Sequence, residues 1–237
     1  MSHHLRVMQH DTHSYVLNSL GSRIAAGDLP ESTVLTLTGL EEEYQVSRTV
    51  IREAVRVLES HGMLVSRRRV GITVQPITSW DLLDGSVIQW RLAGPERDRQ
   101  LVELTQLRAG VEPVAARLAA EHASPEQCEN LIKLAAMMRS LAEQGRGSSP
   151  EFLEADIAFH TVVLEASRSL LLARMAGPII EVITSFAVVH LRTGAPLARS
   201  VTAHAALAHA IQSGDVEAAG EACVVLLAHI SEEITQH

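Results

Sequence analysis

The chain has 237 residues, of which 46% are hydrophobic, and a formal net charge of −8. This length and composition can supply one large or two ordinary domains with hydrophobic cores, which excludes an intrinsically disordered protein. No apolar run approaches the roughly 18 residues of a membrane-spanning helix, and the first residues lack the pattern of a signal peptide. Cys128 and Cys223 match no metal-binding or redox spacing. We therefore expect a cytoplasmic protein with no membrane association.

The N-terminal third of the chain predicts three helices followed by a hairpin. Apolar periodicity favours helices at about 14–26 and at 37–44. A tight turn leads into a third helix, for which Ser47 is a suitable N-cap and Gly62 a suitable C-cap. Two β-prone pieces between residues 63 and 74 then form the hairpin. This order of elements is that of a winged helix-turn-helix.

Basic residues concentrate in the third helix and the hairpin, although the rest of the chain is acidic. The helix carries Arg48, Arg52 and Arg56, and the hairpin tip carries Arg67, Arg68 and Arg69. The three helical arginines lie within about 80° of arc, beside the short polar Thr49. Such a face alone is more often simply solvated. Combined with a basic hairpin, it predicts a major-groove probe with a phosphate or minor-groove contact.

The segment SRTVIREAVRVLESHG, which starts at Ser47, resembles the DNA-binding signature of the GntR superfamily of bacterial repressors. The likeness covers about the first 76 residues. It implies that Arg48 and Arg52 contact the operator and that the wing around Arg68 reaches the minor groove. The full predicted set is Ser47, Arg48, Thr49, Arg52, Arg67, Arg68, Arg69 and Gly71. Thr38 stands where the family commonly has a further DNA-contacting arginine, so that contact does not carry over.

The rest of the chain predicts a linker and an all-helical domain. We expect one short helix within residues 77–95 and two tryptophans that anchor both domains. The linker phrase LLDGSVIQW resembles the galactonate-type repressors of the superfamily. A long helix kinked at Pro113 follows, and further helices are expected at 125–143, 150–168, 170–193, 197–213 and 215–235. Breaks are expected at Gly177–Pro178, Gly194–Pro196 and Gly214–Asp215. The predicted fold is mainly α, with a winged helix-turn-helix (1–76), a linker (77–95) and an antiparallel bundle (96–237).

Several side chains in the bundle could bind a divalent metal ion. Asp156 and His160 stand at i, i+4 and therefore meet on one helix face. His204 and His229 lie on later helices. One carboxylate with two or three imidazoles suits Zn²⁺, Ni²⁺ or Mn²⁺. The chain has twelve histidines, however, and helical histidines are commonly surface or capping residues, so the alternative is that no metal binds.

The bundle resembles the effector domain, called FCD, of the FadR-type branch of GntR regulators. The family patterns R-x₃-EP-x₂-A, D-x₃-H and H-x₅-AI-x₂-GD begin here at Arg108, Asp156 and His204. This resemblance implies that Asp156, His160 and His204 bind the metal. It also implies that Arg108 binds the carboxylate of an organic-acid effector. The alternative for Arg108 is a surface ion pair with Glu112, which would contribute little to stability.

The fourth metal ligand of the family is a histidine, but that position here is Leu226. His229 follows three residues later, about 60° round the helix and about 4.5 Å along it. It could reach the metal only if the helix is shifted or the preceding turn contains extra residues. His190 is a more distant candidate.

These features together predict a ligand-responsive bacterial transcription regulator, a repressor rather than an enzyme. It would bind a palindromic operator as a homodimer and respond to a sugar acid or another small organic acid. Two alternatives stay open. In one, the metal ion itself is the effector. In the other, Asp156, His160 and His204 form the centre of a metal-dependent hydrolase, although no residue presents itself as the general base.

Overall fold

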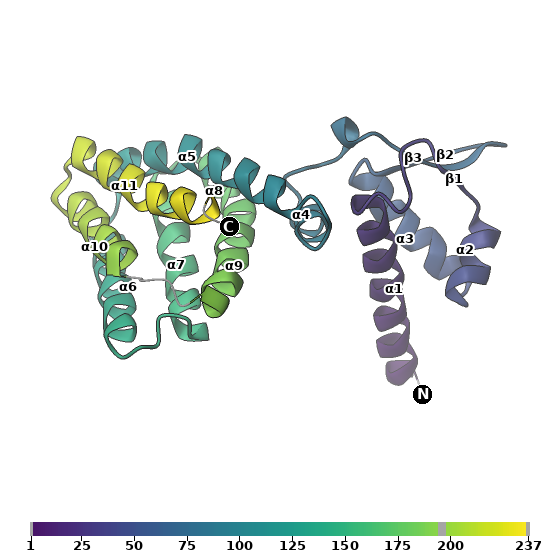
Figure 1. Ribbon diagram of the computed structural model, residues 1–237, viewed down its shortest axis with the longest axis horizontal. Helices are drawn as coiled ribbons and strands as arrows, with labels where there is room; N and C mark the ends of the chain where they lie inside the picture. Colours follow the sequence, from purple (N-terminus) through teal and green to yellow (C-terminus); the bar gives the residue numbers. More distant parts are fainter. Residues whose placement is uncertain (1, 194–197, 236–237) are drawn as a thin grey trace. The chain divides into compact units, whose positions relative to one another are not determined.

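The computed structural model describes residues 2–193 and 198–235, and it describes side chains for residues 12–185 and 199–228. The chain forms two compact units, Met1–Arg97 and Asp98–His237, which we describe separately (Figure 1). Among the helices searched, all in the described part of the chain, none is long and apolar enough to cross a membrane.

The first unit contains the predicted helix, helix, turn, helix and hairpin, which confirms the winged helix-turn-helix. Its elements are α1 (Ser2–Ala25), β1 (Val34–Leu35), α2 (Leu37–Tyr44), α3 (Arg48–Ser60), β2 (Leu64–Arg67), β3 (Gly71–Val74), the 3-10 helix η1 (Ile77–Ser79) and α4 (Gly85–Leu92). Helix α1 begins well before the predicted start at residue 14. The two-residue strand β1 was not predicted, since it is too short to show a period of two.

The three strands form one antiparallel sheet in the order β1-β3-β2. The ribbon β2–β3 is in register from Leu64 opposite Val74 to Arg67 opposite Gly71, and β1 pairs with the other edge of β3. Ile72 and Val74 point from β3 into the core. The hairpin therefore rests on the helices through one face and extends its tip away from them.

Helix α3 packs through the apolar face that its sequence predicts. Its buried residues are Val50, Ile51, Ala54, Val55 and Leu58. They join Val16, Leu20 and Ile24 of α1 in a single hydrophobic core. Thr36 caps α2 by accepting a hydrogen bond from the Gly39 amide at 3.0 Å. The arginines of α3 consequently face away from this core.

The linker helix α4 packs against the first unit. Trp90 is 5% exposed, and its ring NH donates to the Asn18 side-chain oxygen at 3.1 Å. A Cβ at Gly21 would lie 2.6 Å from the Trp90 ring, so a glycine is required at that contact. Trp80 packs against the same core and donates to the Gln75 carbonyl at 2.9 Å. Both tryptophans thus pack and hydrogen-bond within this unit, and the expectation that they anchor both domains stays a prediction.

The second unit consists of helices joined by short turns and loops in its described residues, as predicted. Its helices are α5 (Arg97–His122), α6 (Pro125–Glu143), α7 (Pro150–Ala166), α8 (Leu170–Arg174), α9 (Ala176–Thr193), α10 (Ala198–Ser213) and α11 (Val216–Thr235). The expected helix over 170–193 is interrupted, as predicted, but the break falls at Met175 and not at Gly177–Pro178. Gly177 and Pro178 do not break α9, because they fall in its first turn, where a proline needs no amide hydrogen.

Local sequence signals set the ends of the bundle helices. Ser124 and Gln127 form a capping box at the start of α6, and Ser149 caps α7 by accepting from the Phe152 amide. Helix α10 packs beside α6 and α11, and α7 packs beside α6 and α9 (Figure 1). Phe159 of α7 and Leu207 of α10 are fully buried in the shared core. This packing brings the polar faces of α5, α7 and α10 together inside the unit.

Candidate nucleic-acid interface and candidate metal centre

The exposed side of α3 carries the residues that the sequence assigns to DNA. Ser47, Arg48, Thr49 and Arg52 are all exposed at or near its N-terminal end. Ser47 occupies the N-cap position with an extended backbone, but its side chain does not accept the expected capping hydrogen bond. Ser47 thus takes the predicted N-cap position, which confirms that prediction, but without a hydrogen bond from its side chain. Its hydroxyl therefore does not satisfy the amides at the start of the helix.

Two of the helical arginines form ion pairs on the surface. Arg48 lies 3.4 Å from Glu41 of α2, and Arg56 lies 2.7 Å from Glu53 one turn away. Exposed pairs of this kind contribute little to stability. The pair with Glu41 changes the local charge, because it places a carboxylate beside Arg48, the first arginine of α3. Sequence patterns gave no signal for this contact, which joins two different helices.

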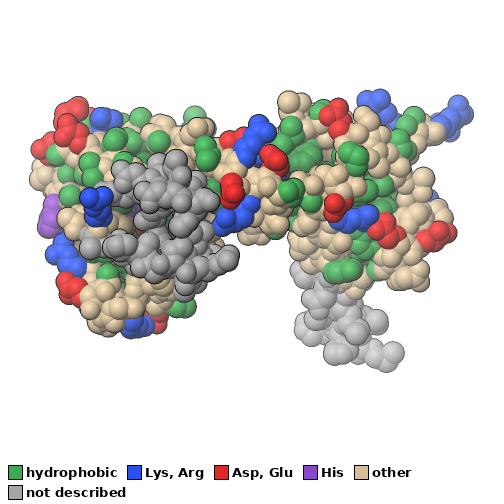
Figure 2. Space-filling model, in the orientation of Figure 1, with side chains coloured by type: hydrophobic (Ala, Val, Ile, Leu, Met, Phe, Trp, Pro, Cys, Tyr) green, Lys and Arg blue, Asp and Glu red, His purple; other side chains and the backbone are tan. Residues whose placement is uncertain are grey.

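The wing holds its three arginines at an exposed tip, where Figure 2 shows basic side chains projecting from the end of the ribbon. The Val70 amide donates to the Arg67 carbonyl at 3.2 Å, and Arg69 adopts a left-handed backbone with φ 65°. Gly71 has φ 113°, and a Cβ there would lie 2.8 Å from the Leu35 carbonyl oxygen. A glycine is therefore needed at position 71 because β1 packs so closely against it, whether or not this residue contacts DNA.

Glu59 of α3 is hydrogen-bonded to the wing. Its Oε1 accepts a hydrogen bond from the Ser66 amide of β2 at 2.6 Å. The bond connects the C-terminal end of α3 with the basic hairpin, so the two arginine groups lie on elements that are directly hydrogen-bonded to each other. No pattern in the sequence predicts this contact, because it joins a helix side chain to the backbone of the following strand.

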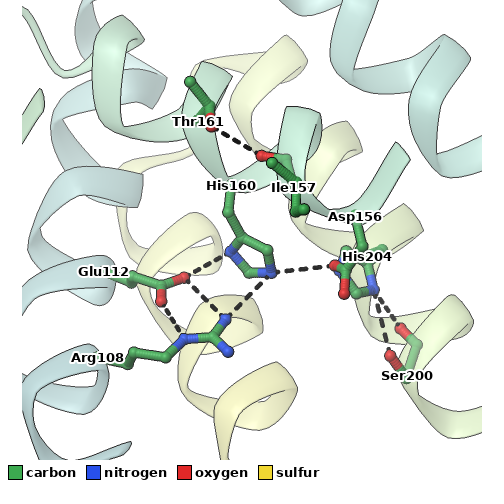
Figure 3. A network of polar contacts seen from close by, with 8 residues as sticks. All are labelled: Arg108, Glu112, Asp156, Ile157, His160, Thr161, Ser200 and His204. Atoms are coloured by element: carbon green, nitrogen blue, oxygen red, sulfur yellow. Dashed lines mark hydrogen bonds and ion pairs between the residues drawn. The ribbon is translucent and has the colours of Figure 1, made fainter. Parts of the chain in front are cut away.

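Asp156 and His160 of α7 meet His204 of α10 in the second unit (Figure 3). One ligand atom from each residue lies within 4.8 Å of the others. The Asp156 Oδ1 atom is 3.0 Å from His204 Nε2 and 3.4 Å from His160 Nε2. Both imidazoles are almost fully buried, and the carboxylate is 21% exposed. Packing thus assembles the three ligands that the resemblance implied.

The hydrogen bonds on the far side of each ring define which nitrogen faces Asp156. His204 Nδ1 lies 2.8 Å from the Ser200 carbonyl oxygen, which can only accept, so this nitrogen carries a proton. His160 Nδ1 lies 2.6 Å from Glu112 Oε2 and donates in the same way. The two Nε2 atoms therefore face Asp156: each donates to its Oδ1 while the ring carries a second proton, and each presents a lone pair when a metal ion replaces that proton. A divalent metal ion fits this donor set, because metal-binding histidines characteristically donate their second NH to a carbonyl or carboxylate.

The charged groups of this cluster shift one another's pKa values. Burial opposes ionisation of Asp156, but hydrogen bonds from His160 and His204 hold its pKa well below the ordinary range. Burial and the charge of Arg108 lower the pKa of His160, but the charge of Glu112 and the hydrogen bonds to Asp156 and Glu112 together outweigh them and raise it to about 9. For Glu112, burial is likewise outweighed by Arg108 and His160, which lower its pKa to about 2. These pKa shifts therefore show that the cluster favours a positive charge beside Asp156.

Arg108 belongs to the same network, although the sequence placed it in an effector site or on the surface. Its side chain is 1% exposed. Arg108 Nε donates to Glu112 Oε1 at 2.5 Å, and Nη2 lies 3.2 Å from His160 Nε2. The ion pair with Glu112 is thus present but buried, which corrects the surface alternative. Glu112 was expected only as the ion-pair partner of Arg108; its contact with His160 was not predicted, because that contact joins α5 to α7.

The side chains of His229 and His190 lie outside the described ones, so their distance from the cluster is not defined. Leu226, at the usual fourth-ligand position, is 1% exposed and belongs to the hydrophobic core of the bundle. This position accordingly contributes packing. The described side chains supply three candidate ligands.

Two family models match the chain. The model for bacterial regulatory proteins of the gntR family matches residues 13–74, and that for the FCD domain matches residues 103–230. The HTH-type transcriptional regulator YieP of Escherichia coli is 33% identical, over 90% of this chain and 92% of its own. The galactonate operon transcriptional repressor of the same species is 27% identical, over 93% of this chain and 96% of its own.

A solved structure has a similar fold. It is that of Lar, which controls expression of the agr system of Listeria monocytogenes, with a TM-score of 0.64 at 16% identity and coverage of 94% of this chain and 96% of that one. The sequence relatives are transcription regulators and not enzymes, which rules out the hydrolase alternative. The chain is a member of the gntR family of bacterial transcription regulators, with an N-terminal winged helix-turn-helix and a C-terminal FCD domain.

Proposed function

We propose that the protein is a repressor that binds a palindromic operator as a homodimer in the bacterial cytoplasm. Its reading elements are Arg48, Thr49 and Arg52 of α3, with Ser47 contacting a phosphate at the start of the helix. The wing residues Arg67, Arg68 and Arg69 contact the neighbouring minor groove or backbone. In a dimer, two such helices enter successive major grooves about 34 Å apart. The exposure of these arginines on one surface with the wing supports this proposal.

The second part of the proposal is a divalent metal ion, Zn²⁺, Ni²⁺ or Mn²⁺, held by Asp156, His160 and His204. The convergence of one carboxylate oxygen and two Nε2 atoms on one point is the observation that carries it. His229 remains a proposed fourth ligand. When bound, the ion supplies positive charge and an open coordination position for an anionic ligand.

The effector that we propose is a small carboxylate, such as a sugar acid. Arg108 is the buried cation beside the metal ligands, and its planar fork suits a carboxylate. The 27% identity with a galactonate operon repressor over nearly the whole chain favours the sugar acids. Binding would shift the population of dimer geometries and so change operator affinity.

The test is operator release. The operator is first selected from random duplexes with the full-length protein, and binding is then measured by gel shift in the presence of galactonate, gluconate and a metal ion. A palindromic site that is released by a sugar acid together with the metal supports the proposal. Release by Zn²⁺, Ni²⁺ or Mn²⁺ alone would favour the metal-sensing alternative instead, and selection of no palindrome would contradict the dimeric repressor.

A further inference from the structure

Glu112 lies between Arg108 and His160 and accepts a hydrogen bond from each of them. Its Oε2 accepts from His160 Nδ1 at 2.6 Å, and its Oε1 accepts from Arg108 Nε (Figure 3). Glu112 is 1% exposed, so both bonds lie away from water. A carboxylate behind a histidine holds the ring in one orientation and makes the opposite nitrogen a stronger ligand. Glu112 therefore favours any cation on His160 Nε2.

Arg108 also lies close to His160 Nε2. Its Nη2 lies 3.2 Å from His160 Nε2, which is the atom that faces Asp156. A guanidinium at this distance can donate to the lone pair, and its charge repels a second cation there. Both effects are strong because the network is buried, where charges interact more than in water. Arg108 therefore disfavours a metal ion at His160.

We propose that Glu112 and Arg108 are positioning residues that control metal binding at His160 in opposite directions. Glu112 turns Nε2 toward the metal, and Arg108 opposes the metal for as long as its own charge is available. An anion that binds Arg108 removes part of this opposition, so metal and anion bind with positive coupling, each favouring the other. This inference rests on the proposed metal site and names how that site is regulated.

The charges of the network agree with this arrangement. With neutral imidazoles, a divalent ion and Arg108 contribute three positive charges, whereas Asp156 and Glu112 contribute two negative ones. The loaded centre thus keeps one positive charge. A buried net charge is costly unless it is paired, so the centre favours a ligand with a single carboxylate over a dicarboxylate.

The test is zinc titration of the full-length protein by calorimetry, with no organic acid present. The variants are Glu112→Gln and Arg108→Gln, which each remove one charge and keep a polar side chain of similar length. We expect Glu112→Gln to weaken zinc binding by about 10- to 100-fold. We expect Arg108→Gln to tighten it by about tenfold or more, because a nearby positive charge is removed. A purely structural role for the pair predicts that both variants weaken binding.

Two controls make the outcome specific. Glu121→Gln removes a carboxylate from the same helix at an exposed position and should leave zinc affinity unchanged. His204→Ala removes a proposed ligand and should abolish tight binding. Wild-type protein that binds no zinc, with His204→Ala behaving identically, would overturn the metal site itself. Zinc binding that needs His204 but is weakened by both charge variants, or altered by neither, would overturn only the present inference.

Folding of each metal-free variant is checked by circular dichroism, since an unpaired buried charge is strongly destabilising. If Arg108→Gln does not fold, the double variant Arg108→Gln, Glu112→Gln replaces it, because that variant leaves no unpaired charge. It should bind zinc more tightly than Glu112→Gln alone. Equal or weaker binding would contradict the opposing role of Arg108.

Discussion

Glu41 Oε1 of α2 lies 3.4 Å from Arg48 Nη1, at the first residue of α3. The acid thus sits beside an arginine that we propose contacts the operator. An ion pair at this point must be broken or shared before Arg48 can bind DNA, and the carboxylate also repels phosphates. Glu41 should accordingly favour those DNA sequences whose contacts with Arg48 are strong enough to replace the ion pair.

Replacing Glu41 with Gln should raise affinity for random duplex DNA by about two- to fivefold, which corresponds to the loss of one partly exposed ion pair. Affinity for the selected operator should rise less, so that discrimination falls. Fluorescence anisotropy with both duplexes measures the two affinities. Glu42→Gln, which removes the same charge from an exposed position on the same helix, is the control. A Glu41→Gln variant that loses operator affinity would instead show that the pair holds Arg48 in its binding position.

Arg52 and Arg68 should differ in how they affect DNA binding. If Arg52 reads a base, Arg52→Ala costs about 1–3 kcal/mol of operator binding and relaxes the preference at one base pair. If Arg68 contacts phosphate, Arg68→Ala weakens binding to all sequences similarly and lowers the salt slope by about one. Salt titrations on operator and random duplexes separate the two effects. Identical behaviour of the two variants would contradict these assignments.

Gly71→Ala should disturb the wing more than its backbone angle alone predicts. Gly27 also has a positive φ, but a Cβ there would meet nothing within 4 Å, so Gly27→Ala should cost only about 1–2 kcal/mol of stability. At Gly71 the added Cβ would lie 2.8 Å from the Leu35 carbonyl, so β1 must move. Chemical denaturation should therefore show a larger loss for Gly71→Ala. A smaller or equal loss would mean that β1 adjusts without difficulty.

Zinc should stabilise the protein against heat, because a ligand that binds only the folded state adds about 2.7 kcal/mol at a hundredfold excess over Kd. The unfolding midpoint of the wild type should rise by about 5–10 °C and return when a chelator is added. Asp156→Asn and His204→Ala should lose this rise. His209→Ala, an exposed histidine on the same helix, should keep it. An equal rise in all variants would place the stabilising zinc elsewhere on the protein.

The sequence by itself determined the class of fold and much of the site. Periodicity located α2 and α6 to the residue, because both are bounded by turn or capping signals that act within a few residues. It also brought Asp156 and His160 onto one face of α7, since i, i+4 neighbours meet in any helix. Strand β1, which depends on pairing with β3, was missed, and the start of α1 was misplaced.

Only the tertiary structure decided how the site is connected. His204 reaches Asp156 across 48 residues, and Arg108 reaches His160 across 52. These contacts depend on how α5, α7 and α10 pack, and no local pattern encodes that packing. Burial then turned the pair of Arg108 and Glu112 from an ordinary surface contact into a charged link to a candidate metal ligand. The residue types were legible in the sequence, but their partners and their burial came from the fold.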